Sequence, residues 1–262
     1  MPARDSAPLG APCWIDLAMS DPAGGRAFYT ELFGWTASEP NAEFGDYVNY
    51  YRNGVRIAGS MPAQPGGFPN VWSTYLAVAD AAKTLEVASA NGAQIYVPAM
   101  QVGDLGAMGV LADPGGAVIG IWQPGVHTGF GLLAEHGTPG WFELLARDYA
   151  GSLDFYRTVF GWDTEPMGDT DEFRYTVVEH GTDQVAGVMD AADWLPEGVP
   201  PHWAVYFAVD DTDASVTKLQ QLGGTVTEPA TDTPYGRMAS VTDPFGARFK
   251  LIGPNDQMPA ND

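Results

Sequence analysis

The hydrophobic and polar positions along the chain alternate between short strand-like runs and amphipathic helical segments. In the first unit a strand-like run ends near Met19, and Asp21 then stands at a suitable position to cap a helix that starts with Pro22. Gly34 is a typical helix stop. Between these two ends, hydrophobic residues recur at helical spacing, at Phe28, Tyr29, Leu32 and Phe33.

Two further strands are predicted after this helix, over residues 47–51 and 56–61. Asn53-Gly54 lies between them and is a strong signal for a tight hairpin turn. Residues 175–179 and 184–189 show the corresponding pattern later in the chain. A strand, a helix and a hairpin therefore follow one another in this unit, which we interpret as a module of the βαβββ type.

The chain contains an internal repeat. Trp14 and Trp141 are separated by the same interval as Trp35 and Trp162, so a whole supersecondary unit is duplicated. A second kind of unit follows each of the first. Its copies open with Trp-x-x-Tyr at 72–75 and 203–206, and they end in Asp-Pro-x-Gly at 113–116 and 243–246.

The repeat predicts an α+β protein with four βαβββ modules in tandem. We expect an N-terminal domain at residues 1–124, a Gly-rich linker at 125–139 and a C-terminal domain at 140–262. The modules are expected at residues 10–62, 71–122, 140–190 and 202–253.

The net charge and the composition of the chain limit the kinds of molecule that it can bind. The net charge is −21 over 262 residues, and this field repels nucleic acid and anionic membranes. No apolar run reaches the ~20 residues of a membrane span. The N-terminus lacks the apolar stretch of a signal peptide, and Cys13 is the single cysteine, so no internal disulfide is possible. A cytoplasmic protein is predicted.

These motifs resemble the vicinal oxygen chelate superfamily, which includes glyoxalase I, extradiol dioxygenases and bleomycin resistance proteins. The resemblance rests on Phe-Tyr-x-x-x-Phe-Gly-Trp at 28–35, its copy at 155–162, and the two Asp-Pro-x-Gly motifs. More narrowly, the chain is similar to two-domain glyoxalase-like proteins of actinobacteria, some of them labelled hydroxylases and found in antibiotic pathways. The resemblance implies two half-open mixed β-barrels, with the helices outside and a pocket on each concave side.

The resemblance also implies where a metal would bind. The family's ligands are a His or Gln on the first strand of a module and a Glu four residues after the glycine of Asp-Pro-x-Gly. The corresponding positions here hold residues that are not normal metal ligands, namely Trp14, Ser73, Gly120, Trp141, Ala204 and Lys250. We therefore expect no metal and no cofactor.

Alternation along the strands, combined with the family's fold, places other side chains in each pocket. Asp16 and Glu143 are the candidate acid-base residues, because a carboxylate on an aromatic wall is typical of functional sites. The candidate ligand contacts are Trp14, Tyr75, Met61, Trp72, Trp141, Tyr206, Met189 and Trp203. Buried packing is the competing interpretation for each aromatic residue and each methionine.

Two functions fit this pattern best. The first is a metal-free protein that binds a planar aromatic natural product or pathway intermediate, for sequestration or to assist a biosynthetic enzyme. The second is a cofactor-free isomerase, lyase or hydroxylase-associated enzyme that uses Asp16 or Glu143 as the base and Tyr75 or Tyr206 to polarise a carbonyl. A divalent-metal glyoxalase or dioxygenase with unusual ligands, and a purely structural role such as a homodimer, remain further alternatives.

Overall fold

The computed structural model describes residues 6–64, 66, 70–170 and 173–255. Within these ranges the chain forms two 8-stranded mixed sheets, each accompanied by two α-helices. The predicted α+β class and the half-open barrels are confirmed, because each sheet curves around one concave face without closing between its edge strands.

The N-terminal half contains a short 3-10 helix, η1, besides its strands and α-helices. Its elements are β1 (Pro12–Met19), α1 (Pro22–Phe33), β2 (Thr36–Ala37), η1 (Ala42–Phe44), β3 (Val48–Arg52), β4 (Val55–Pro62), β5 (Val71–Ala77), α2 (Ala81–Ala90), β6 (Gln94–Val102), β7 (Gly106–Ala112) and β8 (Val118–Pro124). The strand order is β2-β3-β4-β1-β5-β8-β7-β6.

The C-terminal half repeats this arrangement. Its elements are β9 (Thr138–Ala146), α3 (Tyr149–Phe160), β10 (Asp163–Asp169), β11 (Arg174–His180), β12 (Asp183–Asp190), β13 (His202–Ala208), α4 (Thr212–Gln221), β14 (Thr225–Thr233), β15 (Gly236–Thr242) and β16 (Arg248–Gly253). The order is β10-β11-β12-β9-β13-β16-β15-β14, so β9 and β13 take the central places that β1 and β5 hold in the first sheet.

The predicted helix and turn signals act as expected. The Asp21 side chain accepts a hydrogen bond from the backbone N–H of Gly24, and α1 ends at Gly34, which has a φ of 69°. Asn53 and Gly54 both have positive φ, as a type I′ hairpin turn between β3 and β4 requires. These local signals fix where the strands on either side begin.

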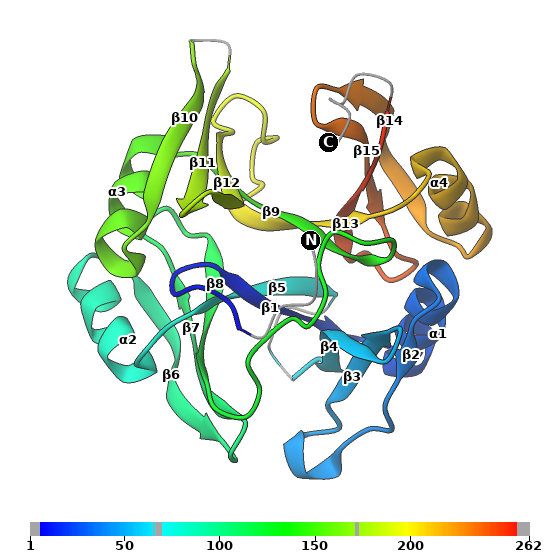
Figure 1. Ribbon diagram of the computed structural model, residues 1–262, viewed down its shortest axis with the longest axis horizontal. Coiled ribbons are helices and arrows are strands. Elements are labelled where there is room, and N and C mark those ends of the chain that lie inside the picture. The colour runs from blue at the N-terminus through cyan, green and yellow to red at the C-terminus, as the bar shows by residue number, and fades with distance from the viewer. Residues whose placement is uncertain (1–5, 65, 67–69, 171–172, 256–262) are drawn as a thin grey trace.

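The two sheets pack against each other through a shared aromatic core. In Figure 1 the central strands β1 and β5 lie next to β9 and β13, while the helices cover the left and right sides. Phe207 of β13 lies 5.0 Å from Phe33 and 5.3 Å from Trp72, centroid to centroid. The Trp162 indole donates to the carbonyl of Gly10 in the other half. One cluster of buried hydrophobic residues spans both halves. The packing therefore does not mark where one domain ends and the next begins, and the domain boundaries stay a prediction.

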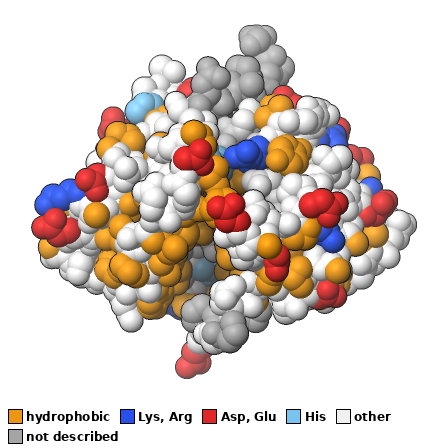
Figure 2. Space-filling model, turned by 90° about the horizontal axis from the view of Figure 1, so that it is seen from below, with side chains coloured by type: hydrophobic (Ala, Val, Ile, Leu, Met, Phe, Trp, Pro, Cys, Tyr) orange, Lys and Arg blue, Asp and Glu red, His pale blue; other side chains and the backbone are white. Residues whose placement is uncertain are grey.

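One outer face of the molecule carries exposed hydrophobic side chains. Figure 2 shows hydrophobic side chains gathered on the lower side of the molecule, the side on which β3 and β6 lie in Figure 1. Tyr96 and Met100 of β6 are among the large hydrophobic residues that are exposed.

In the described part of the chain, no helix is long and apolar enough to cross a membrane.

Candidate functional site

A cluster of three polar side chains lies on the concave face of the C-terminal half. Glu143 comes from β9, Tyr206 from β13 and Lys250 from β16. The register brings them together, because Ala204 lies opposite Glu143 while Tyr206 lies opposite Lys250. The Tyr206 hydroxyl donates to Glu143 Oε2 over 2.6 Å, and Lys250 Nζ donates to the same oxygen over 3.2 Å and to the Tyr206 hydroxyl over 2.7 Å.

The carboxylate of the cluster is buried, whereas the lysine side chain is partly exposed. The Glu143 side chain is 7% exposed, whereas that of Lys250 is 23% exposed. Lys250 Nζ also lies 4.7 Å from the centroid of the Tyr206 ring, a cation–π geometry. Burial, followed by the charge of Glu143, raises the pKa of Tyr206, so the phenol stays protonated. The carboxylate therefore holds the ammonium in place, while part of the Lys250 side chain remains exposed to solvent.

Aromatic side chains from the neighbouring strands lie beside this cluster. The Trp141 indole donates to the Tyr175 hydroxyl over 2.9 Å, and both rings are half-buried. Burial raises the pKa of Tyr175, and the nearby Glu143 charge raises it further. Met189 lies opposite Tyr175 in the β11–β12 pair and is also half-buried. Trp141 and Tyr175 thus offer partly exposed aromatic surface near the charged cluster.

The corresponding carboxylate of the N-terminal half, Asp16, is as buried as Glu143 but has different partners. Asp16 accepts hydrogen bonds from the Tyr75 hydroxyl over 3.3 Å and from the Tyr47 hydroxyl over 3.5 Å, and the Trp14 indole donates to Tyr47 over 2.8 Å. Asp16 is 5% exposed and Trp14 is 4% exposed. Burial raises the pKa of Asp16 to about 7, although the two tyrosine hydroxyls oppose this shift. No cation forms an ion pair with Asp16 among the described residues.

The segment between the halves covers this N-terminal group. The His127 ring packs edge-on against Trp14 at 4.4 Å, and Phe130 lies 5.6 Å from the same indole. His127 is buried, and burial lowers its pKa to about 4, so the ring is neutral. Among the described residues, its Nε2 atom and the Nε atom of Arg56 have no hydrogen-bond partner. The linker therefore closes the face where Trp14 lies.

The residues at the family's metal-ligand positions are not suited to bind a metal ion. Gly120 and Lys250 both stand four residues after the glycine of Asp-Pro-x-Gly, at the position where the family resemblance implies a glutamate ligand. A Cβ added at Gly120 would lie 2.3 Å from Tyr75 Cδ1, so the Tyr75 ring occupies that space. In the other half the same position carries an ammonium, which repels a cation. The described residues contain no group of three or more His, Cys, Asp or Glu side chains that could hold a metal.

The other predicted contacts divide between two environments. Met61 is half-buried at the end of β4. Trp72 and Trp203 lie in the shared core instead, where their indoles donate to the hydroxyls of Tyr29 and Tyr156. Because they are three positions from Tyr75 and Tyr206, alternation places them on the opposite face of the sheet. This placement does not support a ligand contact for either tryptophan.

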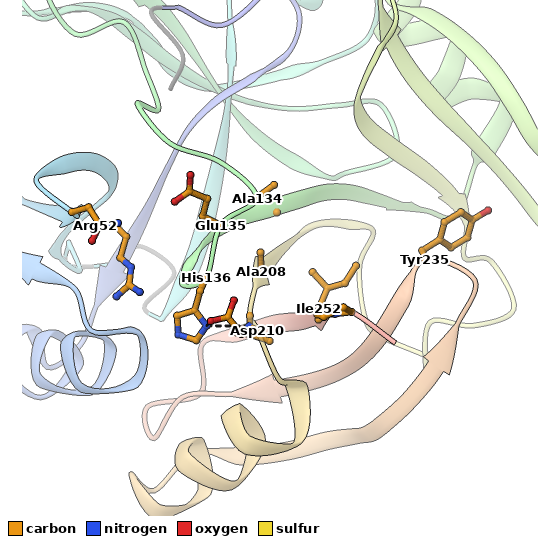
Figure 3. Close-up of a pocket in the computed structure, with 13 residues that line it drawn as sticks. Arg52, Ala134, Glu135, His136, Ala208, Asp210, Tyr235 and Ile252 are labelled. Carbon is orange, nitrogen blue, oxygen red and sulfur yellow. Dashed lines mark hydrogen bonds and ion pairs between the residues drawn. The ribbon is translucent and has the colours of Figure 1, made fainter. Parts of the chain in front are cut away.

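A separate cavity of about 560 Å³ lies beside the linker, away from the candidate residues. Figure 3 shows Arg52, Glu135 and His136 on one side of it, and Tyr235 and Ile252 on another. His136 Nδ1 accepts a hydrogen bond from the backbone N–H of Asp210, a contact that joins the linker to the end of β13. This cavity contains none of the predicted site residues.

Comparison with known proteins points to one family. The family described as "Glyoxalase/Bleomycin resistance protein/Dioxygenase superfamily" matches residues 13–121 and 138–251. The chain is 38% identical to "Putative glyoxylase CFP32" of Mycobacterium tuberculosis, over 98% of this chain and 100% of that protein. It is 39% identical to "Anthracycline biosynthesis protein DnrV" of Streptomyces peucetius, over 96% of each chain.

Solved structures agree on the fold. The Mn(II)-bound glyoxalase from Novosphingobium aromaticivorans has a TM-score of 0.64 at 14% identity, over 96% of this chain and 88% of that one. The 2,3-dioxygenase LapB from Pseudomonas sp. KL28 also has a TM-score of 0.64, at 16% identity, over 100% of this chain and 94% of that one. The chain belongs to the glyoxalase/bleomycin resistance protein/dioxygenase superfamily.

Proposed function

We propose that this protein binds a small planar aromatic molecule without a metal, on the concave face of its C-terminal half. The observation that carries the proposal is the cluster of buried Glu143 and Tyr206 with the partly exposed Lys250, next to the half-buried Trp141, at positions where the family resemblance implies metal ligands. A carboxylate-anchored ammonium beside aromatic surface can orient a ligand by one polar contact and one stacked ring.

A role in a biosynthetic pathway is the second part of the proposal. The relative from Streptomyces peucetius is named as an anthracycline biosynthesis protein, and it shares 39% of its residues with this chain over 96% of both. We infer that this protein sequesters an aromatic intermediate or presents it to a biosynthetic enzyme. The buried, unpaired Cys13 is compatible with the cytoplasmic location that such a role needs.

One ligand per chain is expected, because the two halves differ in access. Trp14 is buried beneath His127 and Phe130, whereas Trp141 is half-buried and the Lys250 side chain is 23% exposed. The two-site arrangement suggested by the repeat is therefore replaced in this proposal by a single C-terminal site.

The test is a panel of planar aromatic compounds in the presence of a chelator, followed by intrinsic tryptophan fluorescence and titration calorimetry. We expect saturable quenching with a stoichiometry near one. Trp141→Leu should weaken binding by up to about tenfold, as expected for loss of an aromatic contact. Trp14→Phe, the matched change in the closed half, should leave the affinity unchanged. Absence of saturable quenching across the whole panel would refute the proposal.

A cofactor-free enzyme is the second candidate, and one observation favours it. The pKa of Asp16 is raised to about 7, which is suitable for a general acid or base near neutral pH. Glu143, with its hydrogen bond from Tyr206, is the equivalent group on the open face. If turnover of a bound ligand is found, the double variant Asp16→Asn, Glu143→Gln should abolish it, and full activity in that variant would remove this assignment.

A further inference from the structure

We propose that the Lys250 ammonium replaces the family's metal as the positively charged group that contacts the ligand, and that the site selects hydroxylated aromatic ketones bound through one ionised hydroxyl oxygen. This inference rests on the proposed function, since it concerns the same face of the C-terminal half. It adds the chemical class of the ligand and the atom that recognises it.

The position of Lys250 supports this role. It stands four residues after Gly246, at the place of the family's metal-binding glutamate, and β16 sets it directly beside Tyr206 of β13. At this position the chain therefore carries a positive charge of its own, in place of a glutamate that would bind a metal ion. A metal ion would have to be bound from solution, whereas the ammonium is part of the chain.

The hydrogen bonds of the ammonium leave one direction open. An ammonium has three N–H donors. One is directed to Glu143 Oε2 and one to the Tyr206 hydroxyl, while the side chain is still 23% exposed. Because Tyr206 donates its own proton to Glu143, its hydroxyl has no donor left for an anionic ligand. The third N–H of Lys250 is therefore the donor available to a ligand.

The chemistry of a lone ammonium favours a single anionic oxygen. Carboxylate and phosphate groups are matched best by the two-pronged guanidinium of arginine, whereas lysine acts as a point charge. A hydroxyl on a planar aromatic ketone ionises readily because its negative charge spreads over the ring and the carbonyl. On binding, its O–H bond breaks, the proton passes to solvent water, and the phenolate oxygen accepts the N–H of Lys250. The ring can then lie on the exposed part of Trp141.

The N-terminal half provides a natural contrast. Gly120 holds the position of Lys250 there, and the Tyr75 ring fills the space beside it. Asp16 has tyrosine hydroxyls as partners and no ammonium among the described residues. The nearest positive charge in that half is the Arg56 guanidinium, which acts on Tyr47 and His127 and has no counterpart of the Lys250 contact to the central tyrosine. The ammonium contact proposed here is therefore specific to the C-terminal half.

The ionisation of a coloured probe measures this contact directly. We would bind 1,2-dihydroxyanthraquinone, whose visible spectrum changes on ionisation, to the full chain in the presence of a chelator. The pKa of the bound probe is then read by spectrophotometric pH titration. Wild-type protein should lower the pKa of the probe relative to free solution. Lys250→Met should raise it by about 1–3 units relative to wild type, the effect of removing an opposite charge at close range.

Three further variants sharpen the test. Glu143→Gln removes the opposing negative charge and should lower the probe pKa below the wild-type value. Lys218→Met removes an equal charge on α4, where Lys218 pairs with Glu31, and should leave the probe pKa within a few tenths of a unit of wild type. Lys250→Met could leave Glu143 buried without its cation. The double variant Glu143→Gln, Lys250→Met avoids this and should return the probe pKa to its value in free solution.

The outcomes separate the two proposals. If the probe binds and its pKa is the same in wild type, Lys250→Met and the double variant, the role of Lys250 is overturned while aromatic binding stands. If neither this probe nor related hydroxyanthraquinones bind the wild-type protein, both proposals are overturned. The opposite shifts expected for Lys250→Met and Glu143→Gln, with no shift in Lys218→Met, support the assignment.

Discussion

The Asp16→Asn substitution should stabilise the protein at alkaline pH, although it removes a carboxylate that accepts two hydrogen bonds. Asp16 is buried, receives bonds from Tyr75 and Tyr47, and has no cation paired with it among the described residues. Burial raises its pKa from 3.8 to about 7. Between these values the folded state holds a proton that the unfolded state has lost. The free energy of unfolding from this group therefore falls as the pH rises through that window.

The magnitude follows from the size of the pKa shift. A difference of about 3 pKa units corresponds to about 4 kcal/mol of destabilisation once the pH is above the folded-state pKa. About half of this cost, ~2 kcal/mol, develops between about pH 5.5 and about pH 8.5. An asparagine at position 16 has no such cost, and its carbonyl oxygen can still accept from Tyr75. Imperfect replacement of the Tyr47 bond should subtract about 1 kcal/mol at every pH.

The assay is urea denaturation of wild type and Asp16→Asn at these two pH values, with the slope against urea checked for equality. The advantage of the variant should grow by ~2 kcal/mol from the lower to the higher pH. Glu143→Gln is the matched control, because it leaves Lys250 without its carboxylate and should destabilise the protein at both pH values. A variant of Asp16 that is less stable than wild type by the same amount at both pH values would refute the reasoning.

Three further predictions concern the core around the two sites. Gly120→Ala should destabilise the fold by about 1–3 kcal/mol in urea denaturation, since its Cβ would meet the Tyr75 ring, and a second change Tyr75→Leu should recover part of this loss. Cys13 should react with a thiol reagent only when the protein unfolds, because burial raises the pKa of its thiol, and labelling of native protein at a rate faster than unfolding would contradict this. Tyr29→Phe should cost about 1–3 kcal/mol of stability, because it removes the hydroxyl that donates to Asp243 across the two halves; an unchanged melting temperature would show that this bond contributes nothing.

Much of the fold could be predicted from the sequence because its signals are local and occur twice. Asp21 and Gly34 mark the ends of α1 through cap geometry that depends on a few neighbouring residues. The Asn53-Gly54 turn requires positive φ at two successive positions, which few other residue pairs adopt easily. The repeat then carries each local prediction to the second half. The resemblance to relatives supplied the curvature of the sheets, which local patterns do not encode.

The partners of the candidate carboxylates could not be predicted in the same way. The sequence identifies Lys250 only as a residue that stands at the position of a metal ligand. Its pairing with Glu143 depends on the register between β13 and β16 and on the neighbouring pairing of β13 with β9. The position of His127 against Trp14 depends on the path of a linker that has no periodic pattern. Trp72 is different, since strand alternation alone separates it from Tyr75 and could have assigned it to the core.

The duplicated halves show how one fold can surround a buried carboxylate with two different sets of partners. Glu143 is buried with an ammonium and a phenol as hydrogen-bond partners, and these contacts hold Lys250 in one position. Asp16 has only neutral partners, and burial favours its protonated form up to about pH 7. The difference follows from one position on the last strand, glycine in one half and lysine in the other, because the glycine leaves space that the Tyr75 ring fills. The proposed ammonium contact is therefore specific to the C-terminal half, while in the N-terminal half Trp14 packs beneath His127 and Phe130.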